Sequence, residues 1–194
     1  MNARSAVVER STKETNIDLR LALDGGPIAV DTDVDFLNHM LDAFAKHSGC
    51  GLTVTARGDG MDHHHLVEDV GIALGKAMHV ALGEKRGIAR FGSAMVPLDD
   101  ALVACAVDLS GRPYLNFQVT FEVESLGQLK TELIGHFFRS LVDNGRFNLH
   151  VIRMNGEVAH HLCEAAFKAF ARAFAQAKVL TDDDQVLSTK GLLE

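Results

Sequence analysis

Apolar and polar residues alternate in several short stretches of the chain, which is the pattern of strands with one buried face. The clearest example is residues 15–23, where every second position from Ile17 to Leu23 is leucine or isoleucine. The Asp-Gly-Gly-Pro sequence at 24–27 predicts a turn, and with it a hairpin into residues 28–31. Further strands are predicted at residues 51–57, 90–97, 101–109, 114–123 and 146–153.

Four longer stretches carry their apolar residues at helical spacing. In the second of them, Val67, Val70, Leu74 and Met78 form a single stripe. The predicted helices cover residues 35–47, 66–84, 130–143 and 159–178.

The predicted elements occur twice in the same order of strands, helix, strand and helix, with no linker between the two sets. We therefore predict an internally duplicated α+β protein, with halves at residues 1–92 and 93–194. Each half is expected to be a two-layer sandwich, in which two helices cover one face of a mostly antiparallel sheet. The halves are expected to pack together as one compact unit.

Composition narrows the class of protein. The chain has 194 residues, of which 47% are hydrophobic, and a net charge of −7 without a basic stripe, which argues against a nucleic-acid partner. No apolar run approaches the roughly 20 residues of a membrane span, and the N-terminus lacks the hydrophobic segment of a signal peptide. The three scattered cysteines are typical of reduced thiols. A cytoplasmic protein without membrane or nucleic-acid partners is expected.

One short motif, His-His-x-x-Glu, occurs twice, and each copy follows another histidine by 24 or 25 residues. The eight residues of the two sets are His39, His64, His65, Glu68, His136, His160, His161 and Glu164. Residues three and four apart share one face of a helix, so each copy can direct an imidazole and a carboxylate at one centre. Such donors suit zinc, manganese, iron or similar divalent ions. Surface histidines would explain one copy, but two matched sets predict a pair of metal ions.

Longer segments resemble the imidazoleglycerol-phosphate dehydratase family. They are FLNHMLDAFAKHSG, DHHHLVEDVGIALG, RFGSAMVPLDDALV, VDLSGRPY, AHHLCEAAFKAFARA and STKG, and they occur in the family's order from Glu9 to Gly191. The chain departs from the family pattern at His63, in place of an acidic residue, and at Leu66, Val158-Ala159 and Leu187. None of these departures removes a predicted ligand.

The resemblance implies a lyase of histidine biosynthesis that removes water from D-erythro-imidazole glycerol 3-phosphate to give imidazole-acetol phosphate. The proton that is lost lies on a carbon with no neighbouring carbonyl, so an enolate route is closed at the outset. An imidazolate held between two divalent cations offers another route, since two metals can stabilise its charge. The resemblance implies two Mn²⁺ ions per active site, although the donor types also allow zinc, iron or cobalt.

The resemblance also implies roles for particular residues. Glu14 would stand at the substrate and move the proton, and Glu68 and Glu164 would be the other catalytic carboxylates. The residues expected to bind substrate are Glu14, His39, His47 and His65, with the phosphate held by Arg90, Arg112, Ser188 and Lys190 and assisted by Lys168. Asp99 and Asp100 are explained as residues of a turn. An assembly of 24 subunits is implied, with active sites at the interfaces.

Two other functions fit the metal ligands. A metal-dependent hydrolase would use the same ions to activate water. A metal-storage or scaffold protein would use the histidines for assembly alone, and it would need neither Glu14 nor the basic residues.

Overall fold

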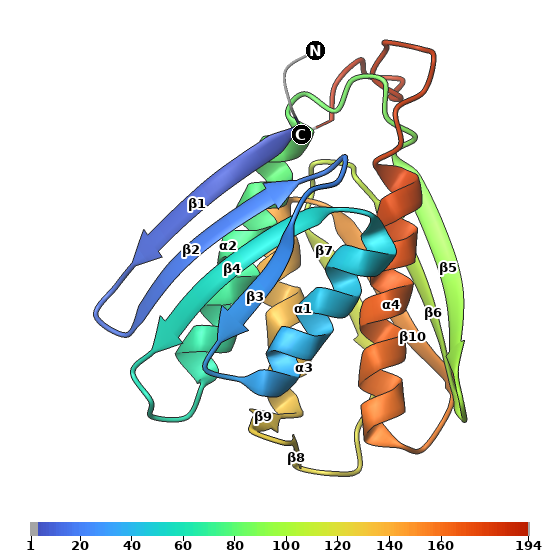
Figure 1. Ribbon diagram of the computed structural model, residues 1–194. Coiled ribbons are helices and arrows are strands. Elements are labelled where there is room, and N and C mark those ends of the chain that lie inside the picture. The colour runs from blue at the N-terminus through green and yellow to red at the C-terminus, as the bar shows by residue number, and fades with distance from the viewer. Residues whose placement is uncertain (1–3, 194) are drawn as a thin grey trace.

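Within residues 4–193, two four-stranded sheets form the outer layers and four helices lie between them (Figure 1). The computed structural model describes residues 4–193. The first sheet has the order β1-β2-β4-β3, with strands Ser5–Ser11, Thr15–Ala22, Gly51–Gly58 and Ile28–Thr32. The second has the order β5-β6-β10-β7, with strands Phe91–Leu98, Ala101–Asp108, Asn148–Asn155 and Tyr114–Gln118. A small hairpin of β8 (Ser125–Leu126) and β9 (Leu129–Lys130) precedes the third helix.

The two sheets have the same topology, which confirms the predicted duplication. In each sheet the first three strands are antiparallel neighbours, and the last strand runs parallel to its partner. The helices α1 (Asp35–Ser48) and α3 (Glu132–Gly145) make the two crossovers to the parallel strands. The helices α2 (His64–Leu82) and α4 (Ala159–Ala177) follow β4 and β10. The second half therefore begins at β5.

The predicted two-layer α+β halves are also confirmed, and the two halves pack helix against helix. Helix α2 covers β1 and β2, and α4 covers β5 and β6. Between the halves, α2 packs on α3 and α1 packs on α4. Gly75 makes the α2–α3 approach possible, because a Cβ at this position would lie 2.4 Å from the carbonyl oxygen of Leu141.

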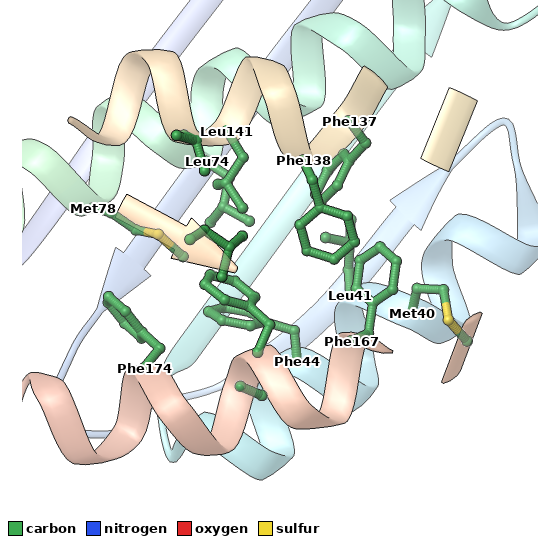
Figure 2. Close-up of a cluster of buried hydrophobic side chains, with 14 of the residues drawn as sticks. Met40, Leu41, Phe44, Leu74, Met78, Phe137, Phe138, Leu141, Phe167 and Phe174 are labelled. Carbon is green, nitrogen blue, oxygen red and sulfur yellow. The ribbon is translucent and has the colours of Figure 1, made fainter. Parts of the chain in front are cut away.

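Phenylalanines from three helices fill the space between the layers (Figure 2). Phe44 of α1 stacks on Phe170 of α4, with 5.4 Å between ring centroids. Phe138 of α3 lies 4.8 Å from Phe167 of α4. All four rings are almost fully buried. This core joins side chains of both halves, so neither half encloses it alone.

Most predicted elements agree with the structure within two or three residues, but three predictions about strands were wrong or incomplete. The hairpin into residues 28–31 does not form, because β3 runs parallel to β4, which lies between it and β2. The strand predicted at 114–123 ends at Gln118. Strand β1 was not predicted, because Ala6 is its one fully buried residue and the alternation is weak. None of the helices among residues 4–193 is long and apolar enough to span a membrane.

Candidate active site

The first group of potential metal ligands joins α1 to α4. His160 and Glu164 lie one turn apart at the start of α4, and His39 faces them from α1. The Nε2 atoms of His39 and His160 both lie 3.2 Å from Oε2 of Glu164. Three donors from two helices therefore converge on one point, and we call them the α1/α4 trio.

The second group joins α2 to α3 in the same way. His64 and Glu68 lie one turn apart at the start of α2, and His136 faces them from α3. Oε2 of Glu68 lies 3.6 Å from Nε2 of His64 and 3.3 Å from Nε2 of His136. The Nε2 atom of His136 is buried and makes no hydrogen bond to any described residue. We call this group the α2/α3 trio.

Both trios fit a divalent ion. Imidazole and carboxylate donors bind zinc-like ions at about 2.0–2.2 Å, so tetrahedral donors lie about 3.4 Å apart. The nitrogen-to-oxygen distances of the trios, 3.2–3.6 Å, agree with that spacing. The buried Nε2 atom of His136 lies 3.3 Å from Glu68 without making a hydrogen bond to it, and an ion between the two groups would satisfy both. The donor set excludes a thiolate site, because the three cysteines are buried elsewhere as free thiols.

Lys168 and Glu164 make an ion pair at the α1/α4 trio, with Nζ 2.7 Å from Oε1. Burial raises the pKa of Glu164, but hydrogen bonds from Lys168 and His39 outweigh it and lower the pKa to about 2. The carboxylate is therefore ionised and presents its other oxygen, Oε2, to the two imidazoles. His47 lies in the last turn of α1, where burial, Lys168 and Arg172 lower its pKa.

In the structure, the upstream histidine of each motif contacts the other motif, and not the one that follows it in the sequence. His39 precedes the first His-His-x-x-Glu motif in the sequence, but it contacts the second motif in space. His136 precedes the second motif and contacts the first. The exchange follows from the helix packing, because α1 lies against α4 and α2 lies against α3.

His65 and His161, the second histidine of each motif, lie outside the trios and meet carboxylates instead. His65 Nδ1 lies 3.3 Å from Asp59 and 3.8 Å from Glu14. The hydrogen bond to Asp59 is the main cause of a raised pKa at His65. His63 precedes α2 with a φ of 63° and belongs to neither trio.

His161 has a closer carboxylate partner than His65. Its Nδ1 lies 2.7 Å from Asp100, and its Nε2 lies 3.3 Å from Asp99. Turn chemistry alone does not account for these two aspartates, contrary to the interpretation from the sequence. The duplication could have identified Asp100 as a candidate site residue. It directly precedes β6 in the hairpin of the second half, just as Glu14 directly precedes β2 in the hairpin of the first.

The residues expected to bind phosphate gather at a cavity of about 1100 Å³. Arg90, Arg112, Ser188 and Lys190 all line it. Arg90 is fixed by Asp108, at 2.7 Å, and by a hydrogen bond of 2.6 Å to the carbonyl oxygen of Leu187. Lys168 does not line this cavity, because it lies at the α1/α4 trio. The cavity can present cationic donors and a hydroxyl to an anion, and we call it the basic cavity.

The basic cavity and the trios lie at opposite ends of the helices. All four helices start at the lower end of the molecule in Figure 1, and the C-terminal segment lies at the upper end. The backbone N–H of Arg90 donates to the carbonyl oxygen of Ala177, the last residue of α4. His160 is the second residue of the same helix, so about 25 Å separates the two ends at 1.5 Å per residue.

Comparison with known proteins gives one consistent family. Residues 32–174 match the family model described as imidazoleglycerol-phosphate dehydratase. The chain is 50% identical to the imidazoleglycerol-phosphate dehydratase of Lachnoclostridium phytofermentans, over 98% of this chain and 99% of the relative. It is 51% identical to that of Desulforudis audaxviator, over the full length of both.

Solved structures agree with these relatives. The imidazoleglycerol-phosphate dehydratase of Staphylococcus aureus superposes with a TM-score of 0.84 at 36% identity, covering 91% of this chain and 99% of that one. The enzyme of Pyrococcus furiosus gives 0.84 at 39% identity, covering 96% and 100%. The fold, the full-length identity and the family model therefore agree, and the chain belongs to the imidazoleglycerol-phosphate dehydratases, the hydro-lyases of histidine biosynthesis.

Proposed function

We propose that this dehydratase is metal-dependent and that it binds two divalent ions per active site, with Mn²⁺ as the expected ion. It would convert D-erythro-imidazole glycerol 3-phosphate to imidazole-acetol phosphate and water. The two histidine–glutamate trios support this proposal, because each brings three suitable donors together from separate helices. When bound, two such ions would supply Lewis acidity and stabilise negative charge on the substrate's imidazole ring.

The trio residues would hold the ions in place. A ligating imidazole must be neutral and a ligating carboxylate ionised. Glu164 meets this requirement, since Lys168 and His39 keep its pKa low. Glu68 would have the same role in the α2/α3 trio, where it lies between His64 and His136.

Glu14 is the proposed group for proton transfer. The reaction removes a proton from one carbon of the substrate and a hydroxyl group from the next, and it leaves an enol that becomes the ketone. Glu14 is exposed in the hairpin before β2, and its Oε2 lies 3.8 Å from His65 Nδ1. An exposed carboxylate beside a predicted metal ligand can take the proton at Oε2 and return it to the enol.

The basic cavity is the proposed phosphate site. Arg112 can offer a planar pair of donors, while Lys190 supplies a point charge. Arg90 is held by Asp108, so its remaining donors are already oriented before an anion binds. Ser188 lines the same cavity and adds a hydroxyl donor.

The distance between the trios and the cavity supports active sites that are shared between subunits. The substrate is far shorter than the roughly 25 Å that separates the two ends of α4. The metal-binding end of one chain would therefore face the phosphate-binding end of another, a heterologous contact that can close into a symmetric particle. We propose a homo-oligomer of 24 subunits, as the family resemblance implies. The buried free thiols support a reducing, cytoplasmic location.

A complementation experiment tests the shared site. One variant, His136→Ala/His160→Ala, lacks a ligand in each trio but keeps the basic cavity. A second variant, Arg112→Ala/Lys190→Ala, lacks the cavity cations but keeps the trios. Each alone is expected to be inactive with Mn²⁺ and imidazoleglycerol phosphate.

The two variants should regain activity when they are mixed, stripped of metal and reassembled with Mn²⁺. A mixture that stays inactive would place each site within a single chain. The wild-type protein, stripped and reloaded in parallel, is the control. If the wild type forms no keto product with any divalent ion, the proposed reaction is wrong.

A further inference from the structure

We propose that Asp100 is a positioning residue, which holds the ring of His161 so that Nε2 is free to bind a metal ion. This inference rests on the proposed function and extends it, because it takes His161, one of the eight ligands predicted from the sequence, as a metal ligand in addition to the trio residues. Asp100 has no role in the family resemblance described above, and turn chemistry does not require a hydrogen bond to a distant helix.

Both oxygens of the Asp100 carboxylate are in use. Oδ2 accepts the backbone N–H groups of Glu157 and Val158, at 2.6 and 3.0 Å. Oδ1 lies 2.7 Å from Nδ1 of His161. The carboxylate therefore ties the β5–β6 hairpin to the start of α4 and fixes one ring nitrogen of His161 at the same time.

The fixed acceptor determines which nitrogen of His161 carries the proton. An ionised carboxylate oxygen can only accept, so Nδ1 must donate and the neutral ring must leave Nε2 unprotonated. A metal-bound histidine typically has this arrangement, with its second ring nitrogen donating to a carboxylate. The contact of Nε2 with Asp99 is longer, at 3.3 Å, and Asp99 is 73% exposed. Asp99 can therefore move away when an ion approaches.

The first half of the chain has a similar device at a different position. Asp59 lies in the loop between β4 and α2, where Oδ1 accepts the backbone N–H of Met61 and Oδ2 lies 3.3 Å from Nδ1 of His65. In both halves, one carboxylate oxygen meets the backbone and the other meets Nδ1 of the second motif histidine. Two different loops reach the same arrangement, which supports a shared need to orient these rings.

The test substitution is Asp100→Asn, which is nearly isosteric. The asparagine oxygen can keep the two backbone hydrogen bonds, so its amide NH₂ faces His161 Nδ1. The amide NH₂ and Nδ1–H are both hydrogen-bond donors and cannot pair, so the proton of His161 should move to Nε2. The nitrogen that would bind the metal ion is then protonated and can no longer do so. We expect Mn²⁺ affinity at the site that uses His161 to fall by about 10- to 100-fold. Binding is measured by equilibrium dialysis with elemental analysis, which does not depend on activity.

Two controls separate positioning from a structural effect. Asp99→Asn changes the exposed neighbour and should leave Mn²⁺ binding unchanged. In the His161→Ala background, Asp100→Asn should cause no further loss, because its effect acts through His161. Thermal melting of the metal-free proteins checks that each variant folds.

The outcomes are distinct for the two proposals. Wild-type Mn²⁺ affinity in Asp100→Asn, or an equal loss in the His161→Ala background, would overturn the positioning role and leave the proposed dehydration intact. A wild-type protein that binds Mn²⁺, but forms no product, would overturn the proposed reaction alone. A wild-type protein that binds no divalent ion would overturn both.

Discussion

The basic cavity gives the sharpest prediction, because its cations differ in how far they are already neutralised. Arg90 is paired with Asp108, so part of its charge is offset before any anion binds. Arg112 and Lys190 make no side-chain ion pair with any described residue within 4.0 Å. Loss of either side chain should therefore remove a contact that is made to the substrate alone.

The expected magnitude follows from the type of contact. A hydrogen bond to a charged group contributes about 1.5–3 kcal/mol, which corresponds to about a 10- to 150-fold change in affinity. Arg112→Ala and Lys190→Ala should each raise KM for imidazoleglycerol phosphate within this range. If both side chains bind one phosphate, the double variant should deviate from additivity.

The assay compares phosphorylated and unphosphorylated substrate. Wild-type enzyme should strongly prefer imidazoleglycerol phosphate to imidazoleglycerol, and this preference should shrink in both variants. The metal content should stay at its wild-type value, because Arg112 and Lys190 line the cavity and belong to neither trio. Arg20→Ala, on the outer face of the first sheet beside Asp18, removes an exposed arginine and serves as the control.

One result would refute this reasoning. If Arg112→Ala and Lys190→Ala reduce activity toward both substrates by the same factor, the cavity does not recognise the phosphate. A loss of bound metal in these variants would show instead that they damage the assembly.

Three further predictions concern the metals, the assembly and a buried lysine. His39→Ala and His160→Ala should each remove one Mn²⁺ per chain. Elemental analysis should find one ion left in His39→Ala/His160→Ala, which damages a single trio, but none in His39→Ala/His136→Ala, which damages both. Equal metal contents in the two double variants would contradict the exchanged trios. A chelator, or pH near 5, should dissociate the particle into a smaller unit, since protonated imidazole cannot bind metal and the metal-binding ends would lie at the contacts between chains. Light scattering that shows one unchanged mass would mean that the ions do not hold the chains together. Burial and the neighbouring Arg146 lower the pKa of Lys85 from 10.5 to about 8. Between these two pH values the unfolded chain binds a proton at Lys85 that the folded chain has lost, so the free energy of unfolding should rise with pH across this range. Lys85→Met should therefore raise Tm at pH 7 and raise it less at pH 10, and an equal gain at both would contradict the argument.

The fold was predictable where one face of an element is strongly buried. The alternation in β2 and the stripe on α2 identify these elements because Leu19, Leu21, Val70 and Leu74 lie in the core. The wrong hairpin prediction concerned which strands pair with each other. A Gly-Gly-Pro turn shows that the chain changes direction, but it does not show that β4 will pair between β2 and β3.

The chemistry of the site was more predictable than its geometry. The repeated motifs identified all six residues of the trios by type and spacing. They could not show that His39 belongs with the second motif, because that contact depends on how α1 packs on α4. Asp100 was set aside because a turn accounted for it locally, and its contact with His161 joins residues 61 positions apart.

The exchanged trios follow from the pseudo-twofold relation between the halves. In a twofold arrangement, residue i of one unit contacts residue j of the other, and j of the first contacts i of the second. Here the upstream histidine of each half meets the His-His-x-x-Glu motif of the other half: His39 contacts Glu164, and His136 contacts Glu68. Neither half can therefore bring three of these donors together alone. Two identical halves packed through the same helix faces would form both trios, so the duplication joins in one chain a pair of ligand sets that is dimeric in its geometry.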